Sequence, residues 1–99
     1  MRASIAIQIE PNMPNDQEAV RVVDEVIDYI KTTGLYYYVG PCETAIEGDD
    51  LGQLLDILHN CMLVAAKAGS AKVSAYTKVL YKPEGSVLTI DEKVTKHHQ

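Results

Sequence analysis

The sequence predicts an α+β fold in which two helices cover one face of an antiparallel sheet. Residues 3–10 alternate between apolar and polar side chains, which is the period of a half-buried strand. Residues 16–34 and 50–69 instead repeat their apolar side chains at the spacing of amphipathic helices. Each helical stretch stands between two strand-like stretches, so the order strand-helix-strand occurs twice along the chain.

The first strand and the first helix have clear ends. Two prolines, Pro11 and Pro14, close the strand. Asn15 is the predicted N-cap of the helix, and Glu18, three positions on, completes a capping box. Gly34 is expected to end the helix in the left-handed conformation. The predicted apolar face of this helix consists of Ala19, Val20, Val22, Val23, Val26, Ile27 and Ile30.

The middle of the chain is typical of a β-hairpin. Residues 35–39, with three consecutive tyrosines, and residues 42–48 are predicted strands, because aromatic and alternating apolar side chains favour strands. The Gly-Pro pair at 40–41 forms the turn between them. Asp49 or Asp50 then caps the second helix.

The second half repeats the pattern of the first. The second helix ends at Gly69, and residues 72–81 form a fourth strand. A turn at 82–85 leads to a short fifth strand at 87–90, and a brief helix follows from Asp91. The predicted apolar side chains of the second helix are Leu51, Leu54, Leu55, Leu58, Met62 and Ala65.

Two right-handed strand-helix-strand units in one antiparallel sheet form a ferredoxin-like two-layer sandwich, βαββαβ, here with a short extra strand or helix at the C-terminus. In this topology strands one and three are central, and both helices cover the same face. If Ile5 and Ile46 face the helices, alternation places Gln8, Glu43 and Glu47 on the other, open face.

An open sheet face on a chain of this size favours self-association. The 99 residues include no Trp or Phe, so the core is modest. Ala6 and Ala45 on the open face allow the close approach of a second sheet. Residues 87–90 are expected to act as an edge strand that pairs with a neighbour. We therefore expect one domain over residues 1–99 that forms a homodimer or a homotetramer.

Composition and charge argue against several classes of function. A net charge of −5 without a basic stripe argues against a nucleic-acid partner. No apolar run is long enough to span a membrane, and the N-terminus does not resemble a signal peptide. We expect a cytoplasmic protein with reduced thiols, in which Cys61 lies in the core and Cys42 is a packed strand residue.

The carboxylates of Glu43 and Glu47 bear most directly on function. Burying unpaired charge costs free energy, so their face is either plain surface or a site for a ligand that donates hydrogen bonds or carries positive charge. As surface residues they pair with Lys78 across the sheet. Acid–base catalysis by the pair is a weaker alternative. Because no nucleophile-histidine, metal-ligand or phosphate-binding glycine spacing appears, we expect no enzyme, no metal and no cofactor.

Three segments carry a resemblance to a known family: SIAIQIEPNMP, TTGLYYYVGPCETAIEGD and LTIDEKV. With them the chain resembles the YkoF-like thiamine-binding proteins over nearly its whole length, most specifically in GPCETAIEG. The resemblance implies ferredoxin-like domains that assemble through their sheets into dimers or tetramers. It also implies that the ligand is thiamine or the hydroxymethylpyrimidine half of thiamine.

The resemblance also implies a set of ligand-binding residues. Alternation turns Thr44 away from the carboxylate face, so its inclusion rests on the resemblance alone. Ala45 stands where the family often has a second threonine, and this difference removes one hydroxyl contact. The candidates that the resemblance implies are Gln8, Glu43, Thr44 and Glu47, followed by Tyr36, Tyr38 and Ser74.

The chemistry of these residues suits such a ligand. A carboxyl group can accept from the amine of an aminopyrimidine and, when protonated, donate to the ring nitrogen. Two neighbouring carboxylates help to retain that proton, and a thiazolium cation suits a second carboxylate or a tyrosine face. We therefore expect a non-catalytic carrier, buffer or sensor. The alternative is a structural or regulatory homo-oligomer without a small-molecule ligand.

Overall fold

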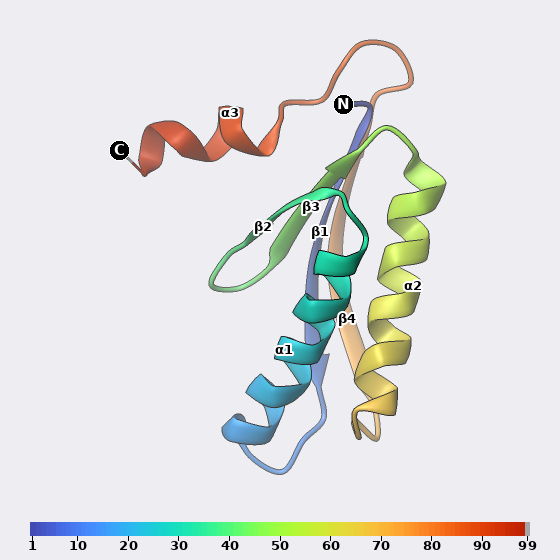
Figure 1. The fold of residues 1–99 in the computed structure, drawn as a ribbon, viewed down its shortest axis with the longest axis vertical. Helices are drawn as coiled ribbons and strands as arrows, with labels where there is room; N and C mark the ends of the chain where they lie inside the picture. The colour runs from blue at the N-terminus through green and yellow to red at the C-terminus, as the bar shows by residue number, and fades with distance from the viewer. Residues whose placement is uncertain (99) are drawn as a thin grey trace.

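The computed structural model describes residues 1–98 as a two-layer α+β sandwich, which confirms the ferredoxin-like class (Figure 1). The elements are β1 (Ala3–Pro11), α1 (Asp16–Thr32), β2 (Tyr36–Val39), β3 (Thr44–Gly48), α2 (Leu51–Lys67), β4 (Val73–Tyr81) and α3 (Ile90–Val94), followed by a 3₁₀ turn at Thr95–His97. The strands run in the order β2-β3-β1-β4, and all neighbours are antiparallel. As predicted, β1 and β3 are central, and α1 and α2 lie side by side on one face (Figure 1).

The core lies between the sheet and these two helices. Ile5 and Ile7 of β1 and Ile46 of β3 are buried in it, as the alternation of their strands predicts. Fully burying one such side chain stabilises a fold by about 1.5–3 kcal/mol. Cys61 is also buried, as expected, and this burial raises the pKa of its thiol to about 11.

The apolar faces of the helices are narrower than the sequence pattern indicated. Val22 and other residues of α1 are fully buried, whereas Val20 has 58% of its surface exposed. Side chains two positions apart on an α-helix point in directions about 200° apart, so these two valines do not share a face. In α2, likewise, Leu55 is exposed, and Ile57, which we did not predict to be buried, packs in the core.

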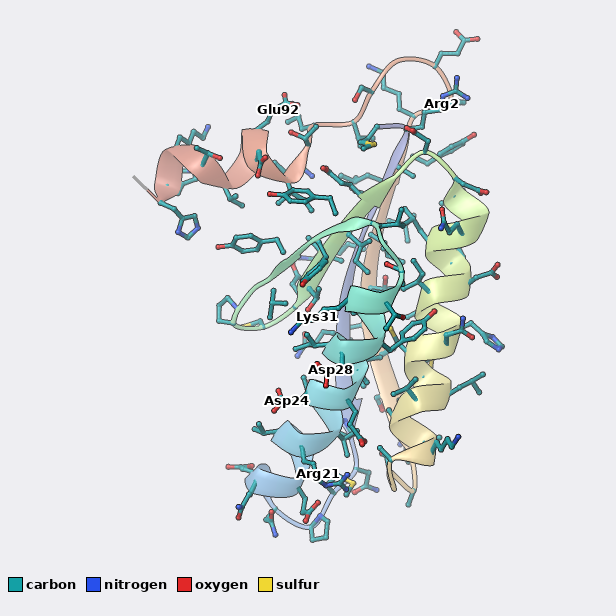
Figure 2. All side chains as sticks on the ribbon, in the orientation of Figure 1. Arg2, Arg21, Asp24, Asp28, Lys31 and Glu92 are labelled. Atoms are coloured by element: carbon teal, nitrogen blue, oxygen red, sulfur yellow. The ribbon has the colours of Figure 1, made fainter. Side chains whose placement is uncertain are left out.

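The helix ends largely follow the sequence prediction. Asn15 caps α1, because its Oδ1 accepts the Glu18 N–H at 2.9 Å. The Glu18 carboxylate does not complete the capping box and instead accepts from Nε of Arg21, near the start of α1, at 2.7 Å (Figure 2). Asp50, the second of the two candidates, caps α2. The glycines that follow α1 and α2 have φ angles of 77° and 117°, in the left-handed region as predicted.

The hairpin turn is longer than predicted, and one prediction about it is wrong. β3 begins at Thr44, so Cys42 lies in the turn and is exposed rather than packed in a strand. The Gly40 N–H donates to the Glu43 carbonyl at 2.9 Å, which closes the turn. A Cβ atom at Gly40 would lie only 2.9 Å from that same oxygen. This position therefore requires glycine, and the turn takes up residues that we assigned to the strand.

Residues 87–90 do not form the predicted fifth strand. Their β-branched and apolar side chains favour a strand, but Thr89 and Glu92 form a complete capping box that starts α3 instead. The predicted C-terminal helix is therefore present and begins one residue earlier than expected. The expected edge-strand role of this segment is wrong for the same reason. Val87 donates to the carbonyl of Met1 at 2.8 Å, within the same chain.

Candidate functional site

The open face, the side of the sheet opposite α1 and α2, has short side chains at its centre. Tyr38, Ala45, Ala6 and Lys78 are direct cross-strand partners, one from each strand, in the order of the sheet. Cross-strand partners project from the same face. The two alanines therefore lie between a tyrosine on one side and a lysine on the other, and their short side chains leave space above the sheet.

Ala45 borders a larger hollow of about 640 Å³, and both alanines border a smaller one. Ligand sites for small molecules typically measure about 300–1,000 Å³, so a vitamin-sized molecule fits. The smaller hollow, of about 250 Å³, lies beside it under α3 and shares Tyr38, Glu43 and Val94 with it. The side chains that border the larger hollow include Gln8, Tyr38, Glu43, Tyr76, Lys78 and Val94.

Glu43 is the carboxylate of the larger hollow. Its side chain is 39% exposed, and its Oε1 lies 3.7 Å from Nζ of Lys78. This is the ion pair that the surface interpretation of the sequence predicted. An ion pair between exposed groups contributes only about 0–1 kcal/mol. A ligand that offers stronger contacts can therefore displace Lys78 at little cost.

Glu47 lies on the same face, as predicted, but in a different environment. It pairs across the sheet with Ser4 and Tyr36, and only 5% of its surface is exposed. Its Oε2 accepts the backbone N–H of Ile90, at the start of α3, at 2.9 Å. The two carboxylates therefore share a face but not a site, because α3 covers one of them.

The two candidate tyrosines also contact the C-terminal segment. The Tyr36 hydroxyl donates to Oδ1 of Asp91 at 2.5 Å, and this hydrogen bond is the main reason that the pKa of Tyr36 is raised. The Tyr38 hydroxyl lies 3.1 Å from Nε2 of His98, within hydrogen-bonding distance. Tyr38 also borders both hollows, whereas Tyr36 borders neither.

Thr44 and Ser74 lie apart from the larger hollow. Thr44 pairs with Ile7 on the helix side of the sheet and is buried, as alternation indicated. Ser74 pairs with Glu10 near the start of β4. Of the seven candidates, the structure brings Gln8, Tyr38 and Glu43 together around the larger hollow.

Sequence reasoning missed several residues of this site, among them Tyr76 and Val94. Tyr76 pairs with Gln8 across the sheet and borders the larger hollow. Its position two residues before Lys78 on β4 is a signal that could have identified it, because such residues share a face. Val94 borders both hollows from α3, and no local signal could have placed a C-terminal residue there.

The described residues form neither a cluster of metal ligands nor a membrane-spanning helix. Within residues 1–98, no group of three or more His, Cys, Asp or Glu side chains is arranged to hold a metal ion. None of the helices in this part of the chain has the length and apolar character to cross a membrane.

Comparison with known proteins gives relatives that cover nearly the whole chain. The family model described as thiamine-binding protein matches residues 5–98. A UPF0045 protein of Clostridium perfringens is 37% identical over 94 residues, which are 95% of this chain and 95% of the relative. These matches extend over both the hairpin and the C-terminal segment.

Solved structures share the fold as well as the sequence. A domain of unknown function from Bacillus cereus is 32% identical with a TM-score of 0.86, over 98% of this chain and 90% of that one. A Thermotoga maritima protein, described as a candidate for thiamine biosynthesis or salvage, is 26% identical with a TM-score of 0.83. That match covers 98% of this chain and 99% of the relative.

Proposed function

Because the chain belongs to the thiamine-binding protein family, we propose that it binds thiamine, or the hydroxymethylpyrimidine half of thiamine, in the larger hollow. The observation that carries this proposal is the position of Glu43, a partly exposed carboxylate beside a hollow of about 640 Å³. The protein acts as a cytoplasmic carrier, buffer or sensor. Its two free cysteines support a reducing compartment.

The residues around the hollow match the two rings of thiamine. The Glu43 carboxyl accepts from the exocyclic amine of the pyrimidine and, when protonated, donates to the adjacent ring nitrogen. Tyr38 and Tyr76 border the same hollow, and aromatic rings suit the thiazolium cation. Lys78 leaves Glu43 when the ligand binds, since a positive charge close to the thiazolium is unfavourable.

A binding role without catalysis is part of the proposal. The described residues that border the larger hollow include the Cys42 thiol and the Glu43 carboxylate but no histidine. A thiol or hydroxyl nucleophile usually needs an adjacent base that a third group orients. This composition supports recognition of the ligand rather than a reaction on it.

Titration calorimetry of the purified protein with thiamine, and then with hydroxymethylpyrimidine, tests the proposal. We expect saturable binding by the wild type and a loss of at least about tenfold in affinity for Glu43→Gln, since an unmade hydrogen bond to a charged group costs about 1.5–3 kcal/mol. Glu84→Gln is the matched control, because Glu84 is an exposed carboxylate in the turn after β4. Absence of binding at millimolar ligand would overturn the proposal.

Self-association is a second candidate function, supported by the exposed side chains of β4. This edge strand pairs with β1 along its whole length and has no partner strand on its other side among the described residues. Four of its large apolar side chains are exposed on its two faces: Tyr76, Val79, Leu80 and Tyr81. Such an edge favours pairing with another copy of the chain.

Light scattering during size exclusion tests this second candidate. We expect a dimer or tetramer for the wild type, and dissociation for Val79→Lys, because a charge on an apolar interface is unfavourable. Val20→Lys, on the exposed side of α1, is the control. A monomeric wild type at micromolar concentration would contradict self-association and would leave the ligand proposal unaffected.

A further inference from the structure

The C-terminal segment is held on the open face by contacts to three residues of β2 and β3. Ile90 donates to Glu47, Asp91 accepts from Tyr36, and His98 lies beside Tyr38. All three sheet residues project from the open face. The same segment contributes Val94 to the border of both hollows.

The contact between Ile90 and Glu47 is the buried one of these three. Ile90 is the first residue of α3, so its N–H has no acceptor within the helix. The Glu47 carboxylate supplies that acceptor at 2.9 Å, and the Ile90 side chain is itself 5% exposed. The other two contacts are exposed to solvent, where water replaces lost hydrogen bonds more readily.

The Glu47 carboxylate takes part in neither the hollows nor an ion pair of the described residues. It does not border either hollow, and among residues 1–98 no basic side chain lies within 4.0 Å of its carboxylate. Glu43, four residues earlier and just before the start of β3, has the opposite character, because it is partly exposed and borders both hollows. The two carboxylates therefore have different tasks.

We propose that Glu47 is a latch, a residue whose carboxylate holds the start of α3 against β3, and that α3 is thereby kept in place as a wall of the ligand hollow. Glu47 is a positioning residue, and Glu43 alone of the two carboxylates meets the ligand. The part of this inference that concerns ligand affinity rests on the proposed function; the part that concerns α3 does not.

Two substitutions separate a latch from a ligand contact. Glu47→Gln keeps an oxygen that can accept the Ile90 N–H but removes the charge, whereas Glu47→Leu removes the acceptor. If Glu47 is a latch, the attachment of α3 survives in Glu47→Gln and is lost in Glu47→Leu. If the Glu47 carboxylate instead neutralises or protonates a ligand, both substitutions abolish ligand binding.

Amide hydrogen exchange of Ile90, followed by NMR, tests the latch without any ligand. We expect exchange of this amide to be about tenfold faster or more in Glu47→Leu than in the wild type, and nearly unchanged in Glu47→Gln. Glu43→Gln is the matched control and leaves Ile90 protected. Equal protection of Ile90 in the wild type and in Glu47→Leu would overturn the proposal.

A second variant covers the case in which Glu47→Leu does not fold. Thr89→Ala removes the capping box of α3, and Thr89 borders neither hollow. We expect this variant to speed the exchange of Ile90 and also to weaken thiamine binding several-fold, because the wall at Val94 is lost. Faster exchange with unchanged affinity would contradict the role of α3 as a wall.

Titration with thiamine separates failure of the latch from failure of the proposed function. We expect Glu47→Gln to bind within about threefold of the wild type, while Glu43→Gln loses at least about tenfold. Loss of binding in Glu47→Gln with Ile90 still protected would make Glu47 a ligand contact and overturn the latch alone. Absence of binding by the wild type would overturn the proposed function, and Ile90 exchange alone would then decide whether Glu47 is a latch.

Discussion

Nζ of Lys78 lies 3.7 Å from Oε1 of Glu43, across the central strand β1, so the acidic residue of the larger hollow already has a cationic partner. Lys78 is 79% exposed over its side chain and is held there by little else. Under the proposed function, a cationic ligand would compete with Lys78 for this carboxylate, and Lys78 would set part of the ligand affinity.

Replacing Lys78 by methionine should strengthen the binding of thiamine. We expect a gain of up to about fivefold, since an exposed ion pair is worth about 0.2–1 kcal/mol. Neutral hydroxymethylpyrimidine should gain less, because it does not carry the thiazolium charge. Lys72→Met, just before β4, is the control for the change in net charge. Equal or weaker thiamine binding by Lys78→Met, measured by calorimetry, would show that the ligand does not replace Lys78 at Glu43.

The two cysteines should differ sharply in reactivity. Cys42 is exposed and borders the larger hollow, whereas burial raises the pKa of Cys61 to about 11. A thiol reagent at pH 8 should therefore label one cysteine in the native protein and both in denaturant. We expect thiamine to slow the labelling of Cys42. Cys42→Ser should remove the native reaction, and labelling that thiamine leaves unchanged would place the ligand elsewhere.

Two neighbouring valines of α1 should differ in their effect on stability. Val22 is 0% exposed and Val20 is 58% exposed. We expect Val22→Ala to lower the free energy of unfolding by about 2 kcal/mol, because it leaves a cavity in the core. Val20→Ala should change it by less than about 0.5 kcal/mol. Urea denaturation compares the two variants, and equal losses would mean that α1 is rotated relative to the sheet.

The attachment of α3 should weaken in acid. Hydrogen bonds with Thr89, first with its backbone N–H and then with its side chain, lower the pKa of Glu92. Figure 2 shows Glu92 on the side of α3 away from β2. Because its pKa is lower in the folded state, Glu92 stabilises α3 above its unfolded pKa, and this contribution is lost as the pH falls through the folded value.

NMR chemical shifts of α3 between pH 7 and pH 3 measure this loss. We expect the helical chemical shifts of the wild type to diminish between roughly pH 5 and pH 3. Glu92→Gln keeps an acceptor but does not titrate, so its α3 should change less over the same range. An identical acid response in both proteins would show that protonation of Glu92 is not the cause of the loss.

Much of the fold could be predicted because the decisive signals are local. The isoleucines of β1 repeat every second residue, and the caps of the helices lie within a few residues of the groups that they bind. The errors arose where two local signals competed. Residues 87–90 are β-branched and apolar like a strand, yet the Thr89–Glu92 capping box starts a helix, because it satisfies backbone groups that an isolated strand leaves unpaired.

The sequence by itself determined the order of the elements from β1 to β4, the face of each strand and hence the placement of Gln8, Glu43 and Glu47 on one side of the sheet. Only the tertiary structure decided that these carboxylates differ. The buried contact between Ile90 and Glu47 joins residues 43 positions apart in the chain. Periodicity describes neighbours in sequence and the faces they share, whereas burial depends on which distant segment folds back over a face, here α3 over Glu47 and not over Glu43.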